Sequence, residues 1–287
     1  MVYFVPMMSE KVKYEMDPLG EKKVTVSKGL IHRYGNRILL VLTEKCASEC
    51  AFCYRKWQRE EKKDFAMATT SDIDDAVKYV ESHKEINEVV LSGGDPLMNF
   101  EYLKYALEIF DAVEQIKVIR IHTRAIIVKP ELVTKEIEKI FKNVKNSVLY
   151  VSLHINHPNE LTKLAMKKIV KIRKTGAILF SQSVFLRGAN DKVETLSELF
   201  TKLLQLGVRP YNIYHCSYVK GAEHFIVPIE KEIEIMTEVK KKVSGLAFPT
   251  LIVDTPGTAG KIPVPLNFWK FELKSYADYE GNEFSEF

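Results

Sequence analysis

The chain has 287 residues, of which 46% are hydrophobic and 28% are charged, and its formal net charge is +4. This length and composition predict one large globular α/β domain and exclude a disordered chain. No apolar run is long enough to span a membrane, and the first residues lack a signal-peptide pattern, so we expect a cytoplasmic protein with no membrane partner. The lysines fall on predicted helix faces, which disfavours a nucleic-acid partner.

Apolar runs typical of strands alternate along the chain with amphipathic stretches typical of helices. The strand runs are Ile38–Leu42, Glu88–Leu91, Val118–Ile121, Val148–Leu153, Ile178–Val184, Tyr211–Tyr214 and Thr250–Val253. The helical stretches are Ser71–Lys84, Glu101–Val113, Pro130–Phe141, Glu160–Thr175, Val193–Leu206 and Lys231–Ser244. This alternation predicts a parallel sheet with right-handed crossovers, either an open doubly wound sheet or a barrel. We favour a partial (β/α)6 TIM-like barrel, with residues 1–30 as an N-terminal extension and residues 31–287 as the core domain.

Three cysteines follow the first of these strand runs in the spacing C-x3-C-x2-C: Cys46, Cys50 and Cys53. Three thiolates on one loop can bind three corners of a [4Fe–4S] cluster and leave the fourth iron open to a small molecule. A structural zinc site usually has four protein ligands, and the only other cysteine is Cys216. The spacing therefore predicts an open iron–sulfur cluster, and it is similar to the signature of radical S-adenosylmethionine (SAM) enzymes.

Polar motifs follow most of the other strand runs, so the carboxyl ends of the strands should meet at one pocket. The motif Ser92-Gly93-Gly94-Asp95 combines a flexible backbone with a carboxylate that can bind an ammonium group. A plain tight turn is the alternative for this motif. Near the C-terminus, a loop rich in glycine and proline leads to Lys261, and such a lysine suits a Schiff base. An exposed loop lysine is the simpler interpretation.

Several longer motifs together resemble the lysine 2,3-aminomutase family, radical SAM enzymes that also use pyridoxal 5′-phosphate (PLP). They run in order from about residue 30 towards the end of the chain. The matching segments are Arg33-Tyr34 with Arg37, the cysteine loop, Ser92–Leu97, Arg120–Arg124, His154–Glu160, Gln182–Asp191, Arg209–Tyr211, Glu223–Pro228 and Asp254–Pro263.

The resemblance implies a role for particular residues of this chain. Lys261 would be the catalytic residue that attaches PLP as a Schiff base, and Arg33 and Arg37 would bind the cofactor phosphate. Arg55 would bind the substrate α-carboxylate beside the cluster. The plain alternative for each arginine is a solvated surface position.

The same resemblance implies a SAM site at the rim of the barrel. The residues expected there are Gly93, Gly94, Asp95, Arg124, His154 and Gln182. A buried, internally satisfied pair of His154 and Gln182 is the alternative for those two. We predict that Asn190 and Asp191 cap the helix that follows them.

The chain departs from the family pattern around the substrate side chain. Two aspartates bind the distal ammonium group in the lysine enzymes; Asp254 matches one, but Ser217 stands in place of the other. A cationic substrate remains favoured, although lysine itself is put in doubt. Thr258-Ala259 also replaces glycines that usually precede the lysine.

The resemblance implies an isomerase, a PLP-dependent 2,3-aminomutase that moves the α-amino group of lysine or a related cationic amino acid to the β-carbon. An electron donor such as ferredoxin or flavodoxin is expected, and the oligomeric state is open. The alternative is a radical SAM enzyme on the same scaffold that acts on another amino acid or modifies a lysine residue of a macromolecule.

Overall fold

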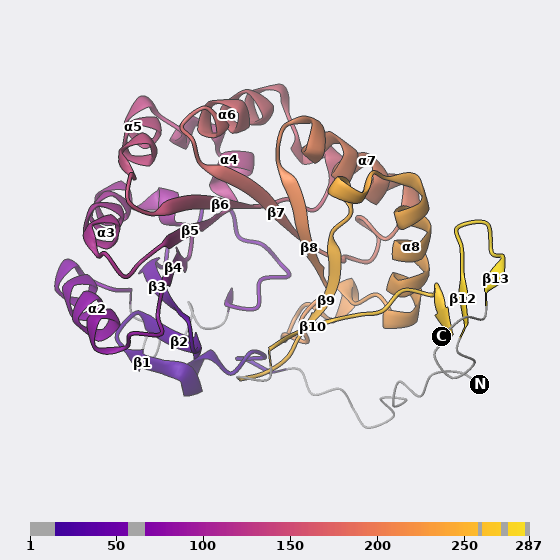
Figure 1. The fold of residues 1–287 in the computed structure, drawn as a ribbon, viewed down its shortest axis with the longest axis horizontal. Coiled ribbons are helices and arrows are strands. Elements are labelled where there is room, and N and C mark those ends of the chain that lie inside the picture. Colours follow the sequence, from indigo (N-terminus) through magenta and orange to yellow (C-terminus); the bar gives the residue numbers. More distant parts are fainter. Residues whose placement is uncertain (1–14, 57–66, 258–259, 271–274, 285–287) are drawn as a thin grey trace.

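The computed structural model describes residues 15–56, 67–257, 260–270 and 275–284. A ten-stranded sheet bends into an open arc, with the helices on its convex side (Figure 1). The strands lie in the order in which they occur in the sequence, from β1 to β10. Since this order never reverses, the doubly wound alternative is wrong, and the predicted α/β partial barrel is confirmed.

Every predicted strand and helix is present, with ends that differ by a few residues. The parallel strands are β3 (Arg37–Thr43), β4 (Glu88–Gly93), β5 (Val118–Thr123), β6 (Val148–His154), β7 (Ile178–Val184), β8 (Arg209–Tyr214) and β9 (Thr250–Asp254). The helices are α2 (Thr70–Ser82), α3 (Phe100–Ala112), α4 (Ala125–Val128), α5 (Lys135–Asn143), α6 (Lys163–Arg173), α7 (Val193–Gln205) and α8 (Ile229–Lys242). In the part of the chain that the structure describes, no helix has the length and apolarity needed to cross a bilayer.

Short antiparallel strands form both edges of the sheet and were not predicted. They are β1 (Thr25–Ser27) and β2 (Leu30–Tyr34) at one edge, and β10 (Lys261–Pro263) at the other. Runs of three to five residues are too short to show a strand period in the sequence. A separate small sheet contains β11 (Trp269–Lys270), β12 (Ser275–Ala277) and β13 (Glu283–Phe284).

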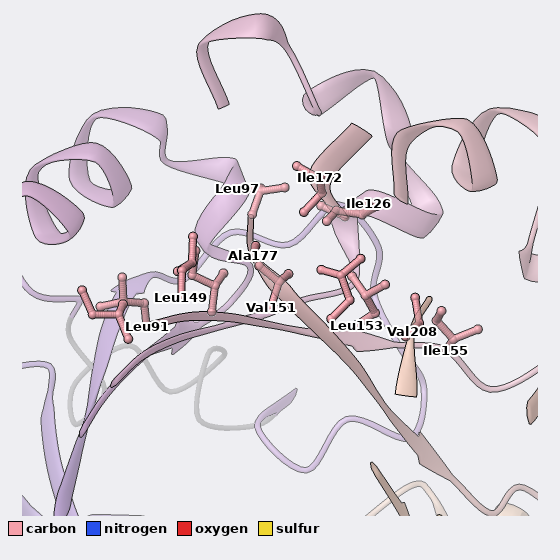
Figure 2. Packing of buried hydrophobic residues seen from close by; sticks show 14 of the residues in the cluster. Leu91, Leu97, Ile126, Leu149, Val151, Leu153, Ile155, Ile172, Ala177 and Val208 are labelled. Atoms are coloured by element: carbon pink, nitrogen blue, oxygen red, sulfur yellow. The ribbon is translucent and has the colours of Figure 1, made fainter. Parts of the chain in front are cut away.

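The hydrophobic core lies between the sheet and the helices. Leu91, Leu149, Val151 and Leu153 belong to this layer, on the helix-facing side of their strands (Figure 2). Because successive side chains of a strand point to opposite faces, the alternate residues point to the concave side. That side is therefore where the polar side chains of these strands gather.

Threonine caps fix the starts of several helices. Thr69, Thr134 and Thr162 each accept a hydrogen bond from the third backbone N–H of the helix that follows. The predicted cap of α7 is wrong, because no side chain caps that helix. Asn190 instead bonds the backbone of Leu186 in the preceding loop, of Val184 at the end of β7, and of Asn156 in the loop after β6.

The N-terminal segment, defined here as residues 15–24, crosses the opening of the arc. Glu15 N–H donates to the carbonyl of Tyr218 at 3.1 Å, and Gly257 N–H donates to the carbonyl of Leu19 at 2.8 Å. The segment ends in a 3-10 helix, η1 (Glu21–Val24), just before β1. Residues 1–14 of the predicted extension lie outside the described residues, and the division between residues 30 and 31 stays a prediction.

Two glycines let the loop after β3 pack closely on the end of β4. Gly94 N–H donates to the carbonyl of Thr43 at 2.6 Å, and Asp95 N–H donates to that of Lys45 at 2.8 Å. A Cβ atom on Gly94 would lie 2.3 Å from the Lys45 carbonyl oxygen. Gly93 has a φ of 116°, which side-chain-bearing residues rarely adopt. Close packing of the two loops therefore requires glycine at both positions.

We expect Gly94→Ala to lower the free energy of unfolding by about 1–3 kcal/mol, because the added methyl group overlaps backbone that cannot easily move. Gly35→Ala is the matched control, since no atom lies within 4 Å of its Cβ position. Urea unfolding of both variants measures the difference. Equal stabilities would contradict the steric role of Gly94.

Candidate functional site

The cysteine loop lies over the carboxyl end of the sheet. Cys46, Cys50 and Cys53 are partly buried cysteines on the loop that follows β3, and none of them is in a disulfide. Cys53 N–H donates to the carbonyl of Cys50 at 3.0 Å, so the loop turns tightly between them. Within the described residues, no three His, Cys, Asp or Glu side chains are placed to hold one metal ion. A four-iron cluster places each thiolate on a different iron, so this donor set fits a cluster better than a single ion.

An arginine and a glutamate hold the far side of this loop. Arg124 follows β5, and its Nη1 lies 2.9 Å from the sulfur of Cys50. Its Nη2 donates to Glu160 at 3.1 Å, and Glu160 also accepts the N–H of Asn156 at 3.1 Å. A guanidinium beside a thiol suits a sulfur that carries negative charge as a metal ligand. Arg124 thereby connects the cysteine loop to the loops after β5 and β6.

The side chain of Asp95 supports the neighbouring loops. Its carboxylate accepts hydrogen bonds from Thr123 Oγ1 and from the backbone N–H groups of Leu97, Arg124 and Ala125, at 2.7–3.1 Å. Burial raises the pKa of Asp95, while these hydrogen bonds oppose the rise. The carboxylate of the predicted SAM motif is therefore turned into the protein, and its predicted contact with SAM stays a prediction.

Two neutral histidines line the concave side below the cysteine loop. His154 ends β6, pairs in register with Gln182 of β7, and its ring packs 5.6 Å from that of Phe52. Burial lowers the pKa of His154 to about 3. Burial also lowers the pKa of His122 in β5 well below its ordinary value, and the charges of Arg55 and Lys261 lower it further.

Several polar atoms around these histidines are buried and make no hydrogen bond to the described part of the chain. They are Nε2 of His122, Nε2 of His154 and Nε of Arg124. The alternative of an internally satisfied His154–Gln182 pair therefore does not hold for Nε2 of His154. Buried polar groups in proteins are nearly always hydrogen-bonded, so such atoms fit a polar ligand with several hydrogen-bonding groups, such as SAM. The roles predicted for Gly93, Gly94, Arg124, His154 and Gln182 stay predictions.

Arg55 follows the last cysteine by two residues and is 7% exposed. Its Nε and Nη2 donate to the two carboxylate oxygens of Glu21, at 2.8 and 2.6 Å, and its Nη1 donates to Ser92 Oγ at 3.2 Å. Although burial lowers it, the pKa of Arg55 is raised overall by Glu21. The surface alternative for Arg55 is wrong, because this guanidinium is buried and paired.

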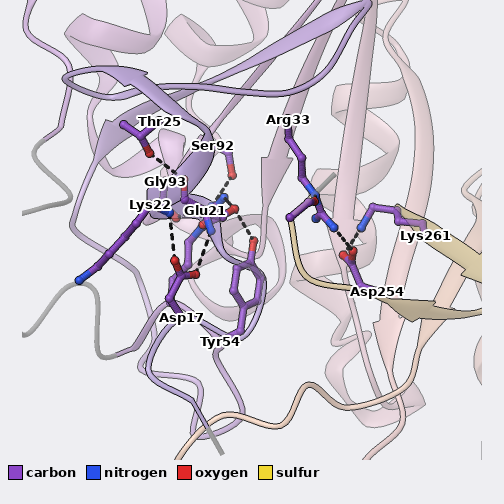
Figure 3. A network of polar contacts seen from close by, with 12 residues as sticks. Asp17, Glu21, Lys22, Thr25, Arg33, Tyr54, Ser92, Gly93, Asp254 and Lys261 are labelled. Atoms are coloured by element: carbon purple, nitrogen blue, oxygen red, sulfur yellow. Dashed lines mark hydrogen bonds and ion pairs between the residues drawn. The ribbon is translucent and has the colours of Figure 1, made fainter. Parts of the chain in front are cut away.

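Asp254 lies between two cations from opposite edges of the sheet (Figure 3). Arg33 of β2 donates to Oδ1 of Asp254 at 2.9 Å, and Lys261 of β10 is in contact with Oδ2. Arg33 also donates to the carbonyls of Thr255 and Gly257 in the turn between β9 and β10. Lys261, which is predicted to hold the cofactor, and Asp254, which is predicted to bind the substrate side chain, thus belong to one ion cluster.

Two cations, Lys261 and Arg37, each lie over an aromatic ring. The ammonium of Lys261 lies 4.5 Å from the ring centroid of Tyr214, and the guanidinium of Arg37 lies 3.9 Å from that of Tyr34. Tyr34 has a buried hydroxyl without a protein partner, which leaves a polar atom for a ligand. The phosphate-binding roles of Arg33 and Arg37 stay predictions. Thr258 and Ala259 lie outside the described residues.

Ser217 and Cys216 lie in the loop after β8. His215, two residues earlier, donates its backbone N–H to the carbonyl of Ile252 in β9 at 2.8 Å. This contact keeps the loop beside the strand that ends in Asp254. The predicted contact of Ser217 with a substrate side chain stays a prediction.

Sequence reasoning missed three residues of this site: Glu21, Tyr54 and Glu160. Burial raises the pKa of Tyr54 well above its ordinary value, and the carboxylates of Glu21 and Asp254 add to the rise. Tyr54 directly follows Cys53, and its hydroxyl donates to Glu21 at 3.4 Å. No local signal could reveal Glu21, because its partner Arg55 is 34 residues away.

Because the pKa of His154 is low in the folded protein, acid lowers the free energy of unfolding. The unfolded histidine binds a proton below about pH 6.5, whereas the folded one stays neutral down to about pH 3. The buried His154 therefore costs no unfolding free energy above pH 6.5, and the free energy of unfolding falls as the pH drops from 6.5 towards 3. We expect His154→Gln to reduce the loss of unfolding free energy between pH 7 and pH 5, by at most about 1.4 kcal/mol per pH unit.

Urea unfolding of the cluster-free protein at both pH values provides the measurement. His224→Gln, at an exposed histidine, is the control and should leave the slope unchanged. An identical slope in the parent and in His154→Gln would contradict the buried neutral histidine.

Comparisons with known proteins agree with this geometry. Residues 40–179 match the model of the Radical SAM superfamily. The chain is 36% identical to the putative L-lysine 2,3-aminomutase of Aquifex aeolicus over 265 residues, which cover 92% of this chain and 70% of that protein. It is also 36% identical to the L-lysine 2,3-aminomutase of Clostridium subterminale, over 88% of this chain and 60% of that protein.

A radical SAM methyltransferase from Sphaerobacter thermophilus has the same fold, with a TM-score of 0.56 over 80% of this chain and 72% of that chain, at 16% identity. The fold is thus shared with a distant radical SAM enzyme, and the sequence similarity extends to lysine 2,3-aminomutases over most of the chain. The [4Fe–4S] cluster and SAM follow from the superfamily, and Cys46, Cys50 and Cys53 remain the predicted ligands of the cluster. This chain belongs to the lysine 2,3-aminomutase family of radical SAM enzymes.

Proposed function

We propose that this protein is a PLP-dependent amino acid 2,3-aminomutase, an isomerase that moves the α-amino group to the β-carbon, with lysine or a related cationic amino acid as substrate. One observation carries the proposal: the N-terminal segment bonds both the turn that leads to Lys261, through the Leu19 carbonyl, and Arg55, through Glu21. The lysine expected to hold PLP and the arginine expected to hold a carboxylate are therefore joined by one short segment beside the cysteine loop.

When bound, the cluster and SAM supply a carbon-centred radical, and PLP supplies an electrophilic carbon and a conjugated ring. The protein contributes binding, orientation and the exclusion of water. Arg33 and Arg37, which flank the turn between β2 and β3, are the candidates to hold a phosphate dianion.

Lys261 must lose a proton before its amine can act as a nucleophile. Oδ2 of Asp254 is in contact with Nζ of Lys261, so this oxygen is the nearest acceptor for that proton. Arg33 on Oδ1 keeps the carboxylate oriented while the proton moves. Tyr214 presents its ring to the same ammonium, which limits the positions that the lysine can take.

The carboxylate of the substrate would bind Arg55. The guanidinium is buried beside the cysteine loop, and its donors suit a planar carboxylate. The two oxygens of Asp254 already bind Arg33 and Lys261, so a cationic substrate side chain would have to share this carboxylate. Ser217 supplies no second charge, so the preferred substrate must be identified by testing several amino acids side by side. A one-electron donor such as ferredoxin or flavodoxin completes the proposal.

The cluster ligands can be tested with matched cysteine variants. We expect Cys50→Ser to lose most of its cluster iron after anaerobic reconstitution, because one iron loses its thiolate. Cys216→Ser should keep it, since burial raises the pKa of Cys216 to about 12 and the thiol stays protonated. Iron, sulfide and visible absorbance are measured for both. Equal iron contents would contradict the cluster assignment.

The reaction can be tested with an amino-acid panel. Reduced, cofactor-loaded protein is incubated with SAM and L-lysine, L-arginine, L-glutamate or L-alanine, and β-amino products are detected by mass spectrometry. Lys261→Ala should lose both PLP absorbance and product but still cleave SAM. Lys242→Ala, at an exposed position at the end of α8, should behave as the parent. Cleavage of SAM by the parent without any β-amino acid would contradict the aminomutase.

A further inference from the structure

We propose that Glu21 is a positioning residue that acts through Arg55 and sets how strongly the site holds the carboxylate of its substrate. The inference rests on the proposed function, because that function assigns a carboxylate to Arg55. It gives the N-terminal segment a part in the site, whereas the sequence indicated only an extension beside the barrel.

Glu21 holds one edge of the Arg55 guanidinium. Its two carboxylate oxygens accept from Nε and Nη2, at 2.8 and 2.6 Å, in a bidentate ion pair. Tyr54 donates its hydroxyl to the same carboxylate at 3.4 Å. Nη1 of Arg55 donates to Ser92 Oγ at 3.2 Å and to the Gly93 carbonyl at 3.4 Å. Nη1 and Nη2 form the other edge of the guanidinium, so a second carboxylate would bind there and share Nη1 with Ser92 and Gly93.

Hydrogen bonds to neighbouring side chains hold the backbone of Glu21 in place. The N–H groups of Glu21 and Lys22 donate to the carboxylate of Asp17, at 3.0 and 2.9 Å, and Thr25 Oγ1 donates to the Glu21 carbonyl at 2.8 Å. Glu21 is 4% exposed, and Figure 3 shows it beside Asp17 and Tyr54. A glutamate held this firmly determines the direction in which Arg55 presents its remaining N–H groups.

Glu21 also offsets the positive charge of Arg55. A substrate carboxylate would share the guanidinium with Glu21, and the two carboxylates would repel each other across it. The substrate is therefore held less tightly than by an arginine without a counter-charge. If Glu21 loses its charge, Ser92 and Gly93 still retain Arg55, and the substrate becomes its only anionic partner. Binding should then tighten, while the carboxylate moves from its productive position.

Glu21→Gln tests this charge effect. Binding of L-lysine and of 1,5-diaminopentane, which lacks the carboxylate, is followed by the absorbance change of the PLP-loaded protein with SAM and without reductant. If the panel identifies another amino acid, that acid and its decarboxylated amine are used. We expect the Kd for the acid to fall about tenfold, or about 1.4 kcal/mol, with the Kd for the amine unchanged and kcat lowered at least tenfold.

Glu21→Asp separates position from charge. It keeps the charge but draws it back by one methylene, so kcat should fall while the Kd for the acid stays within about threefold of the parent. If Glu21→Gln does not fold, this variant alone decides, and a parental kcat overturns the inference. Glu15→Gln is the control on the same segment, because the side chain of Glu15 is exposed.

The remaining outcomes separate this inference from the proposed function. A parallel change in the Kd of acid and amine, or weaker binding of the acid alone, indicates a merely structural role and overturns the inference. If the parent protein binds the acid more tightly than the amine, and Glu21→Gln shows the same ratio of the two Kd values, the inference is overturned and the proposed function stays intact. A parent protein that binds no acid of the panel overturns both.

Discussion

The ion cluster of Asp254 holds together a sheet that does not close on itself. β1 and β10 are the two edges of the ten-stranded sheet, and the order of strands shows no pairing between them. Asp254 of β9 bridges this opening, because it binds Arg33 of β2, the strand next to edge strand β1, as well as Lys261 of β10. A buried carboxylate needs such partners, since an unpaired charge in a low-dielectric interior is costly. The contact that closes the arc thus also fixes the lysine proposed to bind the cofactor.

The rim of the barrel is built so that its loops support one another. Gly94 allows the cysteine loop to rest on the end of β4, and Asp95 collects backbone donors from the loop after β5. Arg124 then links that loop to Cys50 and to Glu160. Asp95 and Arg124, which are predicted to bind SAM, therefore also support the loops around the cysteines.

The N-terminal segment completes the site from outside the repeating strand–helix units. It contacts the loop after β8 through Glu15, the turn before β10 through Leu19, and the cysteine loop through Glu21. These three places carry Ser217, Lys261 and the cluster thiols, respectively. A segment of ten residues therefore connects the regions that are predicted to bind substrate, PLP and the cluster.

The sequence by itself determined the strand–helix alternation, the cysteine loop, the family and the residues most expected to react. These features are local or periodic, so they can be read from spacing and polarity. Only the tertiary structure decided that the sheet stays open, that Asp254 joins its edges, that Asp95 turns inward, and that Glu21 pairs with Arg55. Arg33 and Asp254 are 221 residues apart, and Glu21 and Arg55 are 34 apart. Such pairs depend on how distant charges are buried together, which no local pattern records.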